Sequence, residues 1–342
     1  MRLAILLFAG AWLAQGQVLV FEHATVIDAT GAAPLSDVSV IVRDGLIAQI
    51  GPRLAAPAGA NVIDASAKFL IPGLWDMHVH LGDLEKSFRA LLVHGITGVR
   101  DMQPNMTPRD YVRWRNTATS VRMVLAGFID GPDASNADDA RNAVKRLAAD
   151  GAEFISVGKS LSREAYFALA AECRRIGAAF AGDVPDNVTP QEAAAEGQLS
   201  LEYLPAAPPE AFIEQGTWIT PILVSGRTDP RIVGEMHRAG VSFLAGTDSA
   251  GPWGSSLHQE LELLVASGLT PLQALQTATR NPGFYFGTLP LMGTLEEGKV
   301  ADIVILDSNP LDNIRNTRRI NGVVMRGAYF SRQALDALER EN

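Results

Sequence analysis

The sequence predicts an α/β protein with two parts, a (β/α)8 barrel and a smaller β-domain built from both ends of the chain. Short strand-like runs separated by turn residues fill the first part of the chain after residue 17. The middle alternates apolar strand-like runs with helical stretches, and two more strand-like runs follow near the end. With 342 residues, 47% of them hydrophobic, the chain can bury a barrel-sized core and a small appendage.

The predicted β-domain rests on runs of β-branched and apolar residues that are interrupted by Gly, Asp-Gly and Gly-Pro turns. Because the late runs have the same texture as the early ones, we expect both chain ends to form one unit. The early runs are residues 18–21, 24–27, 38–42 and 47–50, and the late runs are residues 301–306 and 322–325.

The predicted barrel has eight strands, with helical stretches between them that include residues 138–149, 162–176 and 190–195. The link between the last two strands is short, with only residues 231–239 available for a helix. In such a barrel the chemistry lies at the carboxyl ends of the strands. The expected strands are residues 74–81, 98–102, 122–129, 154–159, 179–184, 199–204, 218–224 and 242–247.

Polar side chains end several of these apolar strands. His78 and His80 share one face of the first strand, about 6.6 to 6.8 Å apart along the backbone, so two imidazoles could converge on one metal ion. The alternative is a pair of structural histidines near a strand end. Buried polar groups are costly unless they are paired or bind something, so their number at one barrel end favours a site. The other polar strand ends are Lys159, Asp183, Tyr203 and Asp248.

Residues 1–16 have the pattern of an export signal: Arg2, an apolar run over residues 3–13, and the small-residue site Ala14-Gln15-Gly16. The alternative is an uncleaved anchor, but the run is short for a bilayer, so we expect no stable membrane insertion. Cys173 is the only cysteine, which excludes an internal disulfide and a cysteine metal cluster. We expect the mature protein to be exported, either periplasmic or secreted.

The formal net charge of −9 and the lack of a dense Lys/Arg run argue against nucleic acid or anionic lipid as a partner. We therefore expect a small-molecule substrate that is neutral or cationic. The sequence leaves the oligomeric state open, including a homo-oligomer.

Five motifs together resemble the metal-dependent amidohydrolase superfamily, within its imidazolonepropionase-like and Xaa-Pro dipeptidase-like branch. They are Ile-Pro-Gly at residues 71–73 before the His-Val-His of residues 78–80, Gly-Ile-Thr-Gly-Val-Arg-Asp at 95–101, Ala-Gly-Thr-Asp at 245–248, Leu-His-Gln-Glu-Leu at 257–261, and Gly-Lys-Val-Ala-Asp at 298–302.

The resemblance implies a distorted barrel at residues 71–289 and a β-sandwich domain from residues 17–70 plus 290–332. Residues 333–342 would be a carboxyl-terminal tail.

The resemblance also implies two divalent metals at the strand ends. His78, His80 and Asp248 would hold the first, and Lys159, N-carboxylated to a carbamate, would bridge to the second. Asp248 would act as general base on a metal-activated water. Zinc is the first expectation, with manganese or magnesium as alternatives. Taken alone, Lys159 could instead form an ion pair, and Asp248 could be a helix N-cap.

Substrate contacts by the same resemblance would come from His258, Arg100 and Trp253, although a packing role for Trp253 is an equal alternative. The sequence departs from the family at strands five and six, where Asp183 and Tyr203 stand in place of histidines.

Two outcomes follow from this departure. Either Asp183 and Tyr203 are ligands of the second metal, or only one metal remains. The leading hypothesis is an exported metal-dependent hydrolase of an amide or dipeptide-like C–N bond. The alternative is a catalytically lapsed member that acts as a binder. The short link after residues 221–223 predicts an open pocket.

Overall fold

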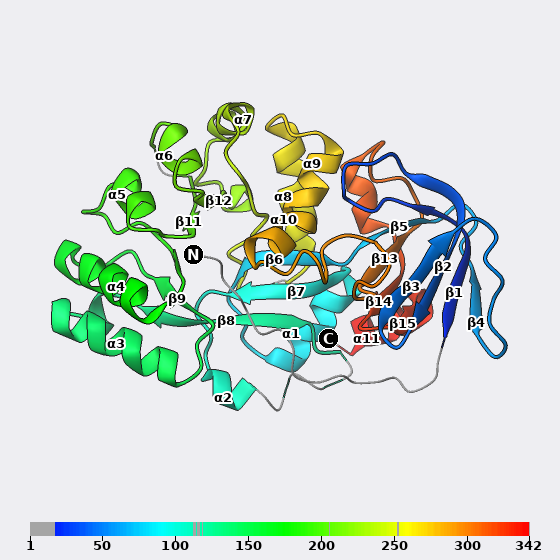
Figure 1. The fold of residues 1–342 in the computed structure, drawn as a ribbon, viewed down its shortest axis with the longest axis horizontal. Coiled ribbons are helices and arrows are strands. Elements are labelled where there is room, and N and C mark those ends of the chain that lie inside the picture. The colour runs from blue at the N-terminus through cyan, green and yellow to red at the C-terminus, as the bar shows by residue number, and fades with distance from the viewer. Residues whose placement is uncertain are drawn as a thin grey trace.

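The computed structural model describes residues 18–341 except residues 112, 113, 115, 116, 118, 205 and 252. The predicted signal at residues 1–16 lies outside the described residues. The described chain forms a barrel of strands surrounded by helices, with a second sheet packed at one side (Figure 1).

The barrel contains a seven-stranded parallel sheet in the order β12-β11-β10-β9-β8-β7-β6. An eighth segment closes the ring through two isolated parallel bridges, Phe243 with Ile219 and Ser249 with Val79. The predicted (β/α)8 barrel is therefore confirmed. Its strands are β6 (Leu74–Val79), β7 (Ile96–Asp101), β8 (Arg122–Ile129), β9 (Phe154–Val157), β10 (Phe180–Gly182), β11 (Ser200–Glu202) and β12 (Trp218–Thr220).

Helices between the strands cover the outside of the barrel, because each buries an apolar stripe against it. Their first turns carry local signals: the Thr189 side chain caps α5 in a capping box with Glu192, and Asn136 caps α3. The helices are α1 (Leu84–Val93), α2 (Pro108–Tyr111), α3 (Ala137–Ala149), α4 (Arg163–Ile176), α5 (Pro190–Ala195), α6 (Glu210–Ile213), α7 (Pro230–Ala239) and α8 (Ser255–Ala266), with 3-10 turns η1 (Gly131–Asp133) and η2 (Leu223–Ser225).

Large side chains fill the inside of the barrel. Trp75, Met77, Phe154 and Leu244 are buried together in one apolar cluster, and they come from strands on different sides of the ring. The barrel is thus a packed core, and the chemistry has to lie at its ends. Two more helices, α9 (Pro271–Thr277) and α10 (Arg280–Tyr285), follow α8 before the chain returns to the second sheet.

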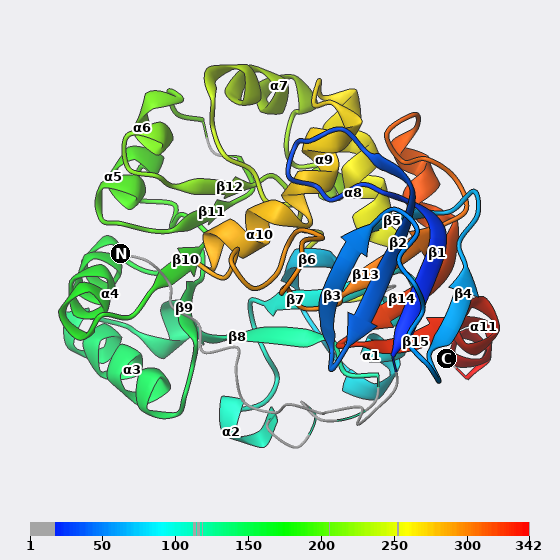
Figure 2. The ribbon, with the colours of Figure 1, turned by 45° about the vertical axis from the view of Figure 1, so that its right-hand side comes forward.

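The second sheet has eight strands in the path β15-β14-β13-β5-β1-β2-β3, with β4 paired to β1. Early and late parts of the chain lie side by side in it, as Figure 2 shows, because β5 pairs with both β1 and β13. The strands are β1 (Leu19–Val26), β2 (Leu35–Arg43), β3 (Leu46–Gly51), β4 (Asn61–Asp64), β5 (Phe69–Pro72), β13 (Ile303–Leu306), β14 (Ile320–Met325) and β15 (Ala328–Ser331), with η3 (Ile314–Arg318) before β14.

The residues expected as a carboxyl-terminal tail form a helix, α11 (Arg332–Arg340), which packs against α1 through the buried Leu335. Among the described residues, none of the helices has the length and apolar character needed to cross a bilayer.

Candidate metal centre

The two histidines of the first barrel strand lie where that strand meets the eighth segment. His78 is in β6, and His80 directly follows it. The backbone N–H of Asp248 donates to the His78 carbonyl at 2.8 Å, and the N–H of His80 donates to the Ser249 carbonyl at 3.0 Å. These backbone bonds hold the two histidines beside Asp248, although they are far apart in sequence.

Three side chains converge at this place. His80 Nε2 lies 2.8 Å from Asp248 Oδ1, His78 Nε2 lies 3.4 Å from the same oxygen, and the two Nε2 atoms are 3.3 Å apart. The described residues contain one group of three or more such ligand atoms within 4.8 Å of one another, and it consists of these three. His80 and Asp248 keep 30% and 23% of their side chains exposed, so the group opens toward solvent.

A buried ion network orients His78 from behind. Its Nδ1 donates to Glu202 Oε2 at 2.7 Å, and Arg100 Nη2 donates to Glu202 Oε1 at 2.7 Å. Arg100 also donates to the Met77 carbonyl at 2.6 Å and to the Ser200 hydroxyl at 2.8 Å. Because Nδ1 is engaged by Glu202, Nε2 is the ring atom of His78 that would bind a metal ion once its proton is displaced.

The same contacts set the ionisation of the network. Burial disfavours the charge on Glu202, but Arg100 and the bond from His78 outweigh it and lower the pKa of Glu202 to about 2. Burial would lower the pKa of His78, but its bonds to Asp248 and Glu202 raise it to about 9. Burial also opposes the charge on Asp248, yet its histidine partners and Tyr203 hold the pKa of Asp248 far below its usual value. Two ionised carboxylates therefore favour positive charge here.

Three non-glycine residues at this end of the barrel have a left-handed backbone: Tyr203 with φ 61°, Ile222 with φ 52° and Asp248 with φ 54°. Such conformations cost of order 1 kcal/mol or more for these residue types and cluster at functional sites. Each follows a barrel strand or the eighth segment, so the backbone turns away from the sheet at the point where these side chains begin.

The two residues that replace histidines lie at the edge of the group. Tyr203 is one residue beyond β11, and its hydroxyl donates a short hydrogen bond to Asp248 Oδ2. Asp183 is one residue beyond β10, and burial raises its pKa to about 6. Its charge is also influenced by His78 and Lys159. Asp183 does not belong to the converging group, whereas Tyr203 contacts one member of it through its hydroxyl.

Lys159 is the predicted site residue that the structure does not bring to the group. Its side chain is 67% exposed and its Nζ lies 3.4 Å from Asp186. The reason is the parity of β9: Phe154 packs in the barrel interior, whereas Ile155 and Val157 pack outside it with the helices. Lys159 follows the outward parity, and β9 already ends at Val157. The ion-pair alternative describes its position here.

Two of the predicted substrate-contact residues are fully buried. Arg100 spends its guanidinium on the network around Glu202. His258 lies in α8, where its two ring nitrogens contact the Thr317 hydroxyl at 2.9 Å and the His94 carbonyl at 3.1 Å. Burial lowers the pKa of His258 to about 3, so it is neutral. The polar atoms of Arg100 and His258 therefore bond to other parts of the protein and are not accessible to a substrate.

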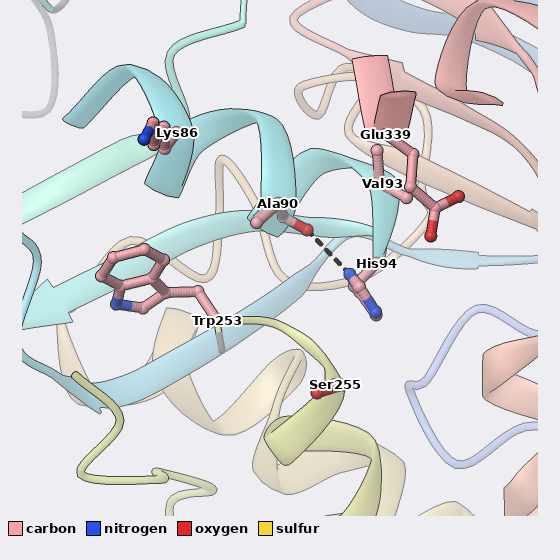
Figure 3. Close-up of a pocket in the computed structure, with 7 residues that line it drawn as sticks. All are labelled: Lys86, Ala90, Val93, His94, Trp253, Ser255 and Glu339. Carbon is pink, nitrogen blue, oxygen red and sulfur yellow. Dashed lines mark hydrogen bonds between the residues drawn. The ribbon is translucent and has the colours of Figure 1, made fainter. Parts of the chain in front are cut away.

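Trp253, the third of these residues, follows the eighth segment and is half-buried. Its Nε1 donates to the His80 carbonyl at 3.3 Å. Figure 3 shows its ring on one side of a cavity of about 320 Å³, with His94 on the other side and Ala90 between them. Trp253 thus hydrogen-bonds to the backbone of His80 and lines a cavity next to α1.

The donor set suits one divalent cation. Two imidazole nitrogens and one carboxylate oxygen from two neighbouring barrel segments are ligands that zinc and related metals accept, and the remaining side faces solvent. The orientation of His78 by Glu202 is the arrangement typical of metal-binding histidines. A second ion bridged by Lys159 does not fit the position of that side chain.

Sequence reasoning missed two residues of this region. Glu202 orients His78, and Arg227 stacks its guanidinium carbon 4.6 Å from the centre of the Tyr203 ring. A signal for Glu202 was available, because an acid inside a buried strand needs a partner, and Arg100 inside another predicted strand needs one as well. Arg227 lies in a loop whose sequence carries no such signal.

The described chain combines a closed parallel barrel, a His-His-Asp group at its mouth and a β-domain from both chain ends. Residues 219–328 match the model of the amidohydrolase family. That match covers part of the chain, and the fold over nearly all of it is like that of a solved Xaa-Pro dipeptidase.

Similar solved structures superpose on nearly the whole chain, whereas the curated sequence relatives match only a short part of it. A dihydroorotase of Trichlorobacter lovleyi is 46% identical over 77 residues, which are 20% of this chain and 18% of that protein. A Xaa-Pro dipeptidase structure with bound methionine superposes with a TM-score of 0.79 at 18% identity, over 92% of this chain and 100% of that one. Molinate hydrolase gives a TM-score of 0.77 at 19% identity, over 94% and 96%. The chain thus spans about a fifth of the length of the curated relatives it matches.

Proposed function

We propose that this protein is a metal-dependent hydrolase that cleaves an amide or dipeptide-like C–N bond of a small molecule. The observation that carries the proposal is the convergence of His78, His80 and Asp248 at the mouth of an amidohydrolase-type barrel. Relatives named as a dihydroorotase and fold neighbours named as a dipeptidase and a hydrolase support the reaction class. The dipeptide-like substrate rests on this likeness of fold.

His78, His80 and Asp248 would hold one divalent ion, and a bound ion would supply Lewis-acid chemistry that polarises a carbonyl and lowers the pKa of water. Glu202 fixes the ring of His78 so that Nε2 points at the site. Asp248 is the candidate general base, and the Tyr203 hydroxyl donates a hydrogen bond to its Oδ2. Zinc is the first choice for this donor set, with manganese or magnesium as alternatives.

Metal content and activity, measured together, test the proposal. We expect about one zinc per purified chain, and hydrolysis of at least one member of a panel of dipeptides, N-acyl amino acids and esters. His80→Ala should lose both, whereas His23→Ala, which changes an exposed histidine of β1, should keep both. Protein that binds no divalent metal and stays inert after incubation with metal and bicarbonate would refute the proposal.

A second candidate is a catalytically lapsed binder. It is favoured by the bond from Tyr203 to the candidate general base and by the exposed position of Lys159. The double change Asp183→His/Tyr203→His separates the two candidates. A large gain of hydrolysis would support the lapsed protein, and loss of an existing activity would show that the Asp/Tyr pair belongs to a working enzyme.

We also propose that the protein is exported, on the composition of residues 1–16 alone. Expression with and without residues 1–16, followed by cell fractionation and amino-terminal sequencing, tests it. The expected product is a shortened chain in the periplasm or the medium that begins near residue 17. A full-length chain in the cytoplasm would contradict the proposal.

A further inference from the structure

The short link after β12 is a firmly tied loop. The buried carboxylate of Glu260 accepts the backbone N–H groups of Leu223 at 3.0 Å and Val224 at 2.8 Å. Farther along, the Thr228 hydroxyl donates to the Pro221 carbonyl at 2.5 Å and closes the loop at its base. These hydrogen bonds hold the loop backbone in one conformation, so the Cα atoms of the loop residues have fixed positions.

Arg227 extends from this loop over the mouth of the site. Its guanidinium carbon lies 4.6 Å from the centre of the Tyr203 ring, and Nη2 lies 3.9 Å from Asp248 Oδ2. The side chain is 66% exposed, so its N–H donors remain accessible to solvent. Stacking on a ring holds the guanidinium plane and leaves its edge free for a planar anion such as a carboxylate.

The rim of the mouth carries a cation beside the acidic ligand Asp248. The net charge of −9 led to the expectation of a neutral or cationic substrate. Near the metal ligands, however, Arg227 presents an exposed cation. Recognition depends on the groups within a few ångströms of the ligand, because water and salt screen the distant charges.

We propose that Arg227 binds a carboxylate of the substrate and makes the enzyme selective for anionic amides, such as N-acyl amino acids. The inference rests on the proposed hydrolytic function. The 3.9 Å between Arg227 and Asp248 means that an anion on the guanidinium brings the neighbouring bonds of the same molecule over the His-His-Asp group. The carboxylate thus sets which bond of the substrate reaches the site.

A matched pair of substrates measures this selectivity. N-acetyl-L-leucine and N-acetyl-leucinol share one amide bond and differ in the carboxylate. We expect the zinc-loaded protein to prefer the acid by roughly 10- to 100-fold in kcat/KM, the range of a charge-assisted hydrogen bond partly open to water. In Arg227→Gln the preference should fall close to one, mainly through KM, and Arg227→Lys should keep part of it.

The control removes the same charge a few residues away. Arg231 lies in the first turn of α7, is 87% exposed and pairs with Asp229, so Arg231→Gln should keep the full preference. Equal loss in both variants, or an unchanged preference in Arg227→Gln, would overturn the proposal. Thermal unfolding verifies that both variants fold.

If no substrate is hydrolysed, binding measurements test whether Arg227 binds a carboxylate. Calorimetric titration of zinc-loaded protein with 4-methylpentanoate and with 4-methylpentan-1-ol needs no turnover. Tighter binding of the acid to the wild type than to Arg227→Gln, by the same factor, supports the role of Arg227 even if the hydrolytic function fails. Equal binding of the acid by both proteins overturns it.

Discussion

Replacing Glu202 by Gln tests the claim that a buried carboxylate orients a metal ligand. Gln keeps an acceptor for His78 but removes the charge opposite Arg100, with both 2.7 Å contacts affected. Loss of such an outer partner weakens metal binding by about 10- to 100-fold. Breaking a buried ion pair from one side costs about 3 to 5 kcal/mol of unfolding free energy, and we expect the lower end because Gln still hydrogen-bonds.

The pKa of Glu202 gives a second estimate of the same cost. Its fall from 4.5 to about 2 corresponds to roughly 3 kcal/mol. Because the folded pKa is depressed, this stability is present above pH 4.5 and is lost as the pH falls toward 2. Urea unfolding at pH 7 and pH 4 should therefore show a smaller pH effect in Glu202→Gln than in the wild type.

The assays are zinc affinity by chelator competition and urea unfolding, with Glu172→Gln as control. Glu172 is also buried and pairs with an arginine, Arg175, but it lies on α4 away from the site. The control should lose some stability and keep zinc affinity. If Glu202→Gln binds zinc as tightly as the wild type does, Glu202 does not orient His78 for metal binding.

Three further outcomes follow from the structure. Burial lowers the pKa of His258 from 6.5 to about 3, so its contribution to stability is lost as the pH falls below 6.5. Between pH 7 and pH 5 the free energy of unfolding should fall by roughly 2 kcal/mol. His258→Gln should reduce this pH dependence in urea titrations, and an unchanged pH dependence would contradict the role of His258. Lys159→Gln should leave zinc affinity and hydrolysis within about twofold, since Lys159 is exposed and pairs with Asp186; a loss of metal would instead support the carbamate. Gly246→Ala would place a Cβ 2.9 Å from that of His78, so we expect about 1 to 3 kcal/mol of destabilisation and weaker zinc binding, and normal values in both assays would exclude this strain.

The fold was predictable because its signals are local and repeated. The run over residues 122–129 was predicted as a strand, and β8 has those bounds. The eighth strand was harder, because only Phe243 and Ser249 of that segment bridge to neighbours. Between them Gly246 packs against Thr220 and His78, and Asp248 adopts a positive φ, which interrupts regular pairing. Those contacts are tertiary, and no window of sequence contains them.

Some features of the candidate site could be predicted from the sequence, and others could not. The grouping of His78, His80 and Asp248 was predictable from the motifs that carry them. The position of Lys159 depends on the parity and length of β9, which ends at Val157. Position 158 also requires glycine, because a Cβ there would lie 2.4 Å from Cγ of Asp130. The partnership of Glu202 with Arg100 joins residues of two strands on the same ring. Sequence indicates that each needs a partner but does not name it.

The junction between the two sheets has a consequence for how the molecule is made. Gly73 alone separates β5 from β6, its N–H bonds to the Asp302 carbonyl at 2.9 Å, and β5 pairs with β13 from Phe69 to Pro72. β5, which leads directly into the strand that carries His78, therefore takes one of its partners from a segment that leaves the ribosome after the entire barrel. During synthesis the sheet that leads into the candidate metal centre is therefore completed only when nearly the whole described chain is available.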